Sequence, residues 1–306
     1  MSFYHILSMD GGGIRGLLTG ILLDRLEQAH PGFLDQVDLF AGTSTGGILA
    51  LGLAAGFSPA QARELYEEKA AFVFADSIWD DLIDLGSAIG AQYSNTNLKQ
   101  ALTEQFGDRT LGDLPKRVLI SSFDLDNQAI GPGAIRTWKP KFFHNYPGPD
   151  SDADQRIVDV ALRTSAAPVS FPVYQGYIDG GVIANNPSMC ALAQALDRGT
   201  ARQRLEDVAL LSVSTGRNPK YLEAGNADWG WTQWARDLRM IGVMMDGSVG
   251  LADYQCERIL REQYHRLDPP LSEATSMDDI EQIPRLKELG MEADLTATLA
   301  WLERYF

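Results

Sequence analysis

The sequence predicts an α/β fold in three layers, α/β/α, with a central and mostly parallel sheet. Two observations support this class. From about residue 3 to residue 216, short apolar runs typical of buried strands alternate with runs of helical periodicity. The 306 residues, 45% of them hydrophobic, suffice for a large core and contain no repeat or low-complexity linker. We therefore expect a single domain over 1–306, with its core at about 3–216 and a helical C-terminal appendage at about 220–306.

The first half of the chain begins with strand, glycine-rich turn and helix, twice in succession. The expected strands lie at 3–9 and 37–41, and the helices that follow them lie at 16–29 and 48–55. Ser58 and Pro59 suit the N-cap and first position of a further helix at 60–71. Residues 72–115 mix aromatic and acidic side chains, and we expect them to leave the core sheet as an excursion.

The second half supplies the remaining strands of the expected sheet. Apolar runs predict strands at 117–124, near 134–138 and just before the DGG sequence at 179–181, and a strand at 207–216 completes the set. Helices are expected at about 156–165 and after Pro187. From about residue 229 onward the chain reads as mostly helical and is rich in tryptophan at its start.

Charge and cysteine content exclude several classes of protein. With 41 acidic and 26 basic residues, a formal net charge of −15, the chain lacks the basic surface that binds a nucleic acid polymer or an anionic membrane. Cys190 and Cys256 lie in helical sequence and are expected to be free thiols, which fits a reducing compartment. No secretory leader or apolar run of about 18 residues is visible, so a cytoplasmic protein is expected, with peripheral membrane contact left open.

The DGGGIRG sequence at 10–16 lies between the first strand and the first helix. Gly11, Gly13 and Gly16 match the GxGxxG spacing of a dinucleotide-binding turn, but the same backbone could hold an oxyanion. A Walker phosphate loop is excluded, because leucines follow Gly16 where Lys and Ser or Thr are required. The dinucleotide reading is weak, since no acidic residue closes the second strand.

That second strand ends in GTSTGG, which contains the GxSxG pattern of a nucleophile elbow. Gly42 and Gly46 flank Ser44 and would allow a sharp turn that leaves the serine hydroxyl exposed above the sheet, with Thr43 and Thr45 on either side. The alternative is a glycine-rich turn that merely lets a helix pack closely.

A serine nucleophile needs a base, and each of the four histidines is poorly placed for this role. His5 lies within a strand, His30 just past a helix and His144 in an aromatic loop, while His265 reads as an exposed residue at a helix end. A carboxylate is the other candidate. Asp179 precedes two glycines on a predicted tight loop and could serve as the base directly, although DGG is also an ordinary turn sequence.

These three motifs, in this order and spacing, closely resemble those of the patatin-like phospholipase family. The resemblance covers about residues 3–216 and extends to further segments at 121–127, 163–174, 179–187 and 210–216. It implies a catalytic dyad of Ser44 and Asp179 without histidine, and an oxyanion hole in the backbone around Gly11, Gly12 and Gly13 with Arg15 in support. No metal or cofactor is implied.

The resemblance further implies a lipid acyl hydrolase, of the phospholipase A or lysophospholipase kind, that acts on a lipid or ester through an acyl-enzyme. Two alternatives stay open: a regulated effector phospholipase that waits for an activator such as a cyclic dinucleotide, and a non-catalytic member that binds an anion. The sequence does not predict the headgroup, the chain length or the oligomeric state. Candidate lipid contacts, each also readable as core, are Trp79, Leu82, Ile83, Leu85, Trp229, Trp231, Trp234 and Met240 to Met245.

Overall fold

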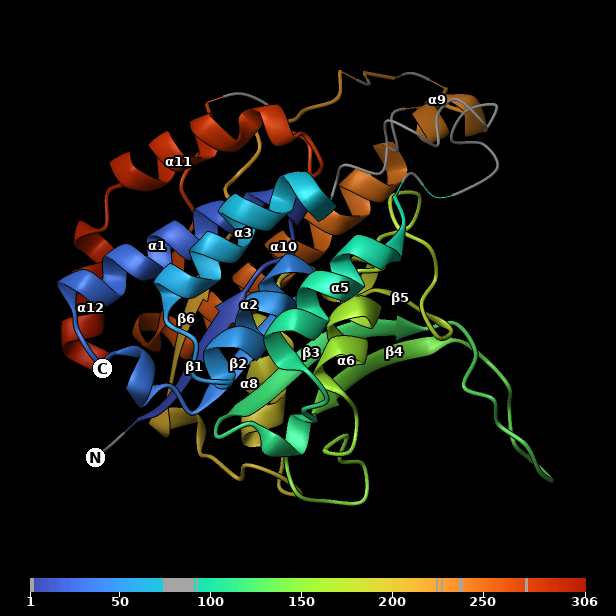
Figure 1. The fold of residues 1–306 in the computed structure, drawn as a ribbon, viewed down its shortest axis with the longest axis horizontal. Helices are drawn as coiled ribbons and strands as arrows, with labels where there is room; N and C mark the ends of the chain where they lie inside the picture. Colours follow the sequence, from blue (N-terminus) through green and yellow to red (C-terminus); the bar gives the residue numbers. More distant parts are fainter. Residues whose placement is uncertain are drawn as a thin grey trace.

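The central element of the computed structural model is one twisted sheet (Figure 1). The structure describes residues 3–73, 91, 93–223, 225, 226, 228–236, 239–272 and 275–306. Within them the sheet has the order β4-β3-β2-β1-β6-β7, and β5 pairs with β3. The strands are β1 (Tyr4–Met9), β2 (Leu39–Thr43), β3 (Arg117–Asp124), β4 (Lys139–His144), β5 (Tyr177–Asp179), β6 (Val208–Val213) and β7 (Tyr264–Leu267). Only β4 and β5 run antiparallel to their neighbour β3, which confirms the expected mostly parallel sheet.

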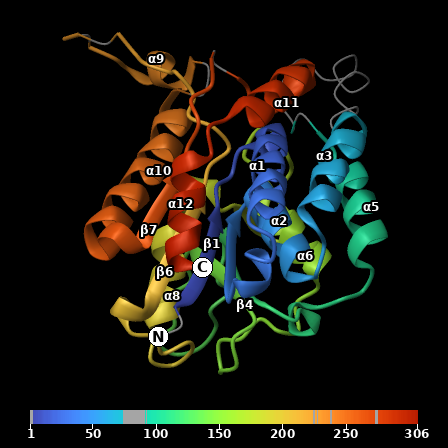
Figure 2. The same cartoon turned by 90° about the vertical axis from the view of Figure 1, so that its left-hand side faces the viewer.

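Helices cover both faces of this sheet and make the expected three layers (Figure 2). One layer holds α1 (Gly16–Ala29), α2 (Thr45–Ala54), α3 (Pro59–Val73), α5 (Asn95–Phe106), α6 (Ile157–Thr164) and α11 (Ile283–Glu292). The opposite layer holds α8 (Ser188–Leu196) and the long α10 (Arg239–Leu260). The remaining helices are α7 (Gly181–Ala184), α9 (Trp231–Ala235) and α12 (Thr296–Tyr305).

The side-chain alternation of the strands divides the core between these layers. Leu7 and Met9 of β1 join the larger hydrophobic cluster beneath α1 and α2, whereas Ile6 joins a smaller one beneath α8 and α10. The central strands β1, β2 and β6 bury both faces, as parallel strands between two helical layers do. Because β1 and β2 are parallel neighbours, the glycine-rich loop that follows β1 and the turn at Ser44 that follows β2 lie together at the carboxyl edge of the sheet.

The C-terminal segment is more than a helical appendage. It is mostly helical, but it also supplies β7, which pairs in parallel with β6 and extends the main sheet. The expectation that the strand at 207–216 completes the set is therefore wrong. His265 lies within β7, where its ring stacks on Trp301 and its Nε2 lies 2.9 Å from the Thr298 hydroxyl, so its expected place at an exposed helix end is also wrong.

Residues 125–138, which we call the arm, differ from expectation as well. The predicted strand near 134–138 is absent there, because β4 begins only at Lys139. The arm instead leaves the end of β3, projects clear of the body and returns to β4 (Figure 1). Of the expected excursion at 72–115, α5 and the end of α3 are described, while residues 74–90 lie outside the described part of the chain.

Candidate active site

Ser44 occupies a strained turn between β2 and α2. Its backbone has φ 54 and ψ −123, a left-handed conformation that is rare for a residue other than glycine. The backbone N–H of Ser44 donates to the Thr164 hydroxyl at 2.8 Å, and that hydroxyl donates to the carbonyl of Ser121 at 2.6 Å. The turn is thus held by α6 and β3, as expected for a nucleophile elbow.

The two glycines of this elbow are required by close packing of backbone. A Cβ on Gly42 would lie 2.1 Å from the carbonyl oxygen of Gly46, and a Cβ on Gly46 would lie 2.3 Å from the carbonyl oxygen of Met9. Thr43 between them donates its hydroxyl to the carbonyl of Ala184 at 2.6 Å. Thr45, the other predicted elbow residue, is the first residue of α2 and lines the cavity described below.

Asp179 ends β5 beside the serine. Its side chain is buried and accepts hydrogen bonds from the Ser44 hydroxyl and, at 2.7 Å, from the backbone N–H of Gly181. Burial raises the pKa of this carboxyl from 3.8 to about 6, although both hydrogen bonds oppose the rise. The structure therefore brings together the two residues predicted as a dyad, with the carboxylate more basic than an ordinary aspartate.

The glycine-rich loop lies next to them, but its three glycines play different parts. The N–H of Gly11 donates to the carbonyl of Asn185 at 3.0 Å, and the carbonyl of Gly11 accepts from Thr215 at 3.1 Å and from the Asn185 amide at 3.3 Å. Gly11 is therefore tied into the fold and is not free to bind an oxyanion, which corrects the prediction for this residue. Gly12 and Gly13 line the cavity that contains Ser44.

Arg15 supports the same loop from outside the cavity. The side chain is buried, burial lowers its pKa, and its Nε and Nη1 donate to the carbonyls of Gly12 and Gly216, each at 3.4 Å. Within the described residues no carboxylate forms an ion pair with it. Arg15 therefore contacts the carbonyl side of the loop and does not line the catalytic cavity.

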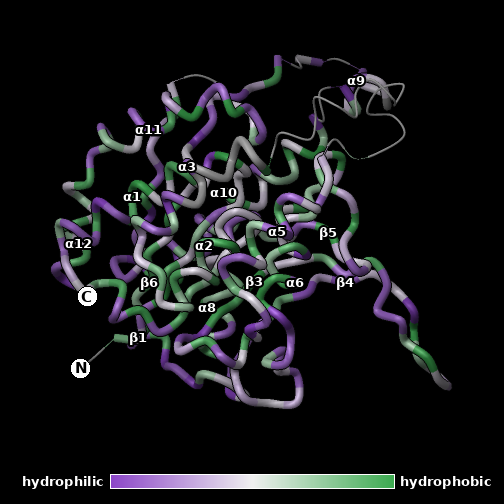
Figure 3. Tube along the Cα trace, viewed as in Figure 1, coloured by the Kyte–Doolittle hydropathy of each residue, from purple (hydrophilic) through white to green (hydrophobic). Residues whose placement is uncertain are grey.

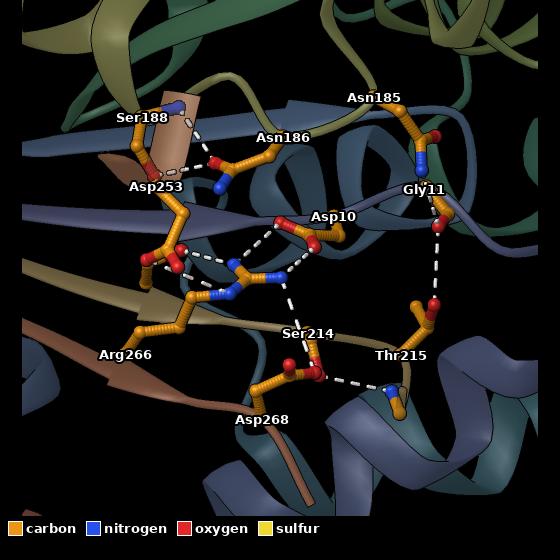
Figure 4. Close-up of polar contacts among 12 residues, drawn as sticks. Asp10, Gly11, Asn185, Asn186, Ser188, Ser214, Thr215, Asp253, Arg266 and Asp268 are labelled. Carbon is orange, nitrogen blue, oxygen red and sulfur yellow. Dashed lines mark hydrogen bonds and ion pairs between the residues drawn. The ribbon is translucent and has the colours of Figure 1, made fainter. Parts of the chain in front are cut away.

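Sequence reasoning missed the residue that holds the start of this loop. Asp10 is buried, and Arg266 of β7 donates to its carboxylate at 2.6 and 3.3 Å and to the Ser212 hydroxyl at 2.8 Å. Figure 4 shows the guanidinium between Asp10, Asp253 and Asp268. The latter two lie 3.9 and 4.0 Å from it. No local signal marks Arg266, because its partner is 256 positions away in the sequence.

A cavity of about 470 Å³ opens beside Ser44 and Asp179. This volume is within the usual range for small-molecule sites. Its wall is mostly apolar and is built from Ile48, Leu98, Phe171, Val182, Ile241 and Met245, among others. The predicted apolar stretch at 240–245 is divided: Ile241 and Met245 face the cavity, whereas Met240, Val243 and Met244 are exposed.

Other candidates from the sequence lie elsewhere. No histidine is among the described residues that line the cavity. Trp79, Leu82, Ile83 and Leu85 lie outside the described residues, as does the side chain of Trp231, while Trp229 and Trp234 pack edge to face near α9. In the described part of the chain, no three histidine, cysteine or acidic side chains are grouped to hold a metal ion, and no helix has the length and apolar character to span a bilayer.

The chain was compared with known protein families and with individual proteins of similar sequence. The family model described as patatin-like phospholipase matches residues 7–192. The protein CotR of Bacillus subtilis (strain 168) is 30% identical, covering 99% of this chain and 98% of CotR. A cGAMP-activated phospholipase of Pseudomonas aeruginosa is 31% identical over 90% of this chain and 81% of that protein. One of Vibrio cholerae is 36% identical over 69% of this chain and 64% of that protein.

Proposed function

Because this chain belongs to the patatin-like phospholipase family, we propose that it hydrolyses acyl-ester bonds of lipids with Ser44 as nucleophile and Asp179 as general base. Family membership makes the chain a lipid hydrolase. Its assignment as a serine carboxylic-ester hydrolase rests on one observation: the hydrogen bond between the Ser44 hydroxyl and Asp179 at the wall of an apolar cavity.

The reaction begins with proton transfer. Asp179 takes the proton of the Ser44 hydroxyl as the oxygen attacks the ester carbonyl, which gives a tetrahedral intermediate. When the ester C–O bond breaks, Asp179 returns this proton to the departing alcohol oxygen, which leaves an acyl-serine and a free carboxylate. The carboxylate then takes a proton from water as the water attacks the acyl-serine, and it passes that proton to the Ser44 oxygen as the fatty acid leaves. A pKa of about 6 suits this role, because the group is ionised at neutral pH and holds a proton more firmly than an ordinary aspartate.

The negative oxygen of the tetrahedral intermediate needs donors. The backbone N–H groups of Gly12 and Gly13 support this role, since both residues line the cavity and the described residues offer neither N–H a hydrogen-bond acceptor. One such donor is worth about 3 kcal/mol of transition-state stabilisation. Asp10, Gly11 and Arg15 would hold the loop in the conformation that presents these donors.

The apolar cavity suits the acyl chain of the substrate. Ile241 and Met245 of α10 form one side of it, so the C-terminal segment contributes to substrate binding. The net charge of −15 favours neutral or zwitterionic lipids over anionic ones. Cys190 and Cys256 are free thiols, which supports action in a reducing compartment such as the cytoplasm.

Regulation by an activator is the second candidate. It is favoured by the similarity to two cGAMP-activated phospholipases at 31% and 36% identity. Under this hypothesis the same dyad performs the reaction, but turnover requires a cyclic dinucleotide. The third reading, a non-catalytic anion-binding protein, has less support because Ser44 and Asp179 are already hydrogen-bonded.

The direct test compares wild type, Ser44→Ala and Asp179→Asn on a short p-nitrophenyl ester and on phosphatidylcholine vesicles, with and without cGAMP. We expect wild type to hydrolyse both substrates and each variant to lose at least about 1000-fold in kcat. Activity that appears only with cGAMP would establish the regulated form. Turnover that survives in Ser44→Ala would refute the assignment.

A further inference from the structure

The arm exposes large apolar side chains to an unusual degree. Ile130 is 95% exposed, Ile135 78% and Trp138 69%. Single exposed apolar residues are common on soluble proteins, but three within nine residues on one projecting hairpin form a concentrated apolar element. Figure 3 shows the outer part of the arm as hydrophobic and its base as hydrophilic.

Hydrogen bonds and an ion pair join the two limbs of this hairpin, although residues 130–138 are all exposed. Its two limbs are joined through Asn127, whose N–H donates to the carbonyl of Thr137 at 3.0 Å and whose side chain bonds to the Ile135 carbonyl and the Thr137 N–H. An ion pair between Asp126 and Arg136 ties the limbs again. The apolar side chains are therefore presented on a formed scaffold, so little further ordering is needed when they bind.

The arm starts close to the strand ends that carry Ser44 and Asp179. On β3, Ser121 lies beside Thr43, and Ser122 lies beside Asp179 in the register of β5. The arm begins three residues later, where the N–H of Leu125 donates to the carbonyl of Gly176. The chain just before Gly176 includes Phe171, which lines the catalytic cavity. Arm and cavity thus share one edge of the sheet.

Charge distinguishes the arm from the body that carries it. The chain has a net charge of −15, yet residues 125–138 carry no net charge, because their one acidic residue, Asp126, pairs with their one basic residue, Arg136. At about 3.3 Å per extended residue, the tip stands on the order of 20 Å beyond β3. This exceeds the Debye length of about 8 Å at physiological ionic strength, so the tip is screened from the acidic body.

We propose that the arm docks the protein on a lipid bilayer, with Ile130, Ile135 and Trp138 entering the headgroup region of a zwitterionic leaflet. Tryptophan is favoured at that depth, and isoleucine gains by leaving water. The inference rests on the proposed function, because a lipid substrate must be reached at a surface. A protein partner fits less well, since one narrow hairpin tip presents far less than the roughly 800 Å² per partner of a standard protein interface.

Binding is tested apart from catalysis. In the Ser44→Ala background, sedimentation with phosphatidylcholine vesicles is compared with and without the triple change Ile130→Ser, Ile135→Ser and Trp138→Ser. We expect the arm variant to lose at least tenfold in vesicle partition. A control triple variant removes exposed apolar side chains elsewhere, at Leu205, Ile259 and Met291, and should stay within twofold. Equal loss in both variants, or no vesicle binding by the parent, would overturn the proposal.

Two further measurements use protein that retains Ser44: ester hydrolysis, and the molar mass from light scattering. The arm variant should keep the turnover of a short soluble p-nitrophenyl ester within twofold but lose at least tenfold on vesicles. Vesicle hydrolysis that the arm variant leaves unchanged would refute docking. A molar mass that differs between wild type and the arm variant in light scattering without lipid would also refute it, because it would indicate that the arm contacts a second copy of the chain. Arm-dependent vesicle binding by a wild type that hydrolyses neither substrate would uphold docking and refute the proposed hydrolysis.

Discussion

Replacement of Arg266 by methionine should destabilise the protein severely, because it removes the cation that neutralises buried Asp10. Methionine keeps much of the side-chain volume and leaves no charge. The Arg266 side chain is only 9% exposed and donates to Asp10 and to Ser212, so both acceptors lose their donor at once. Asp253 and Asp268 would then face Asp10 with no arginine between them.

The size of the effect follows from burial. Removal of one member of a buried ion pair costs about 3–5 kcal/mol, since the remaining charge is left desolvated. Burial already raises the pKa of Asp10, and Arg266 opposes that rise. Without the arginine, the pKa of Asp10 should rise further. The double variant Arg266→Met, Asp10→Asn removes both charges and should recover about half of the lost stability.

Urea unfolding of wild type, both single variants and the double variant gives the coupling energy, expected at about 2–3 kcal/mol. The surface ion pair of Arg285 and Glu288 is the matched control and should couple by less than about 1 kcal/mol. In the ester assay, folded Arg266→Lys should lower kcat more than it raises KM, because the loop that holds the oxyanion donors is loosened. The reasoning would be refuted if the losses of unfolding free energy in the two single variants added up to the loss in the double variant. It would also be refuted if Arg266→Met were as stable as wild type.

Three further outcomes are expected. The acid limb of kcat/KM should have a pKa near 6, with activity lost as the pH falls through it, because Asp179, as the proposed base, must be ionised. An acid limb near pH 4 would contradict the raised pKa. Asp179→Asn should be inactive yet more stable by up to about 3 kcal/mol above pH 6, since the raised pKa means that the folded state disfavours the carboxylate. In urea unfolding, the extra stability of Asp179→Asn should shrink as the pH falls from 6 to 4. A gain that stayed constant over this range would contradict the raised pKa of Asp179. Gly46→Ala should lower the free energy of unfolding by on the order of 3 kcal/mol, because its Cβ would meet the Met9 carbonyl. Gly250→Ala is the control: its Cβ would meet open space, so thermal melting should show no loss of stability or a small gain.

Strands with long apolar runs could be predicted from the sequence, and short or partner-dependent ones could not. β1 and β6 bury every or nearly every side chain, so their sequences carry a clear signal. β7 has only four residues, two of them His265 and Arg266, and is a strand because β6 offers it a free edge. The run at 134–138 has the isoleucine, threonine and tryptophan of a strand, but it forms one limb of the arm, which contacts the other limb mainly through Asn127 and is not assigned as a strand.

The candidate site divides in the same way. Ser44 and Asp179 could be singled out as candidates because each lies in a local motif whose glycines indicate a constrained backbone, and the structure places the two residues side by side. The use of the Gly11 N–H by Asn185, and the pairing of Asp10 with Arg266, depend on residues far away in the sequence. Such contacts leave no spacing pattern in the sequence. Only the structure shows that Gly11 is hydrogen-bonded within the fold whereas Gly12 and Gly13 line the cavity.

The anchors of the glycine loop also fix the order in which the site can be assembled. Ser44 and Asp179 are synthesised before Thr215, Arg266 and Met277, whose carbonyl accepts from the N–H of Ile14 at 2.7 Å. A nascent chain that already carries the dyad therefore has a loop without these supports. Pairings of such large sequence separation form late in folding. If the proposed ester hydrolysis is correct, it should start only after β7 and the segment that follows it have left the ribosome, so an unfinished chain would not hydrolyse lipid esters.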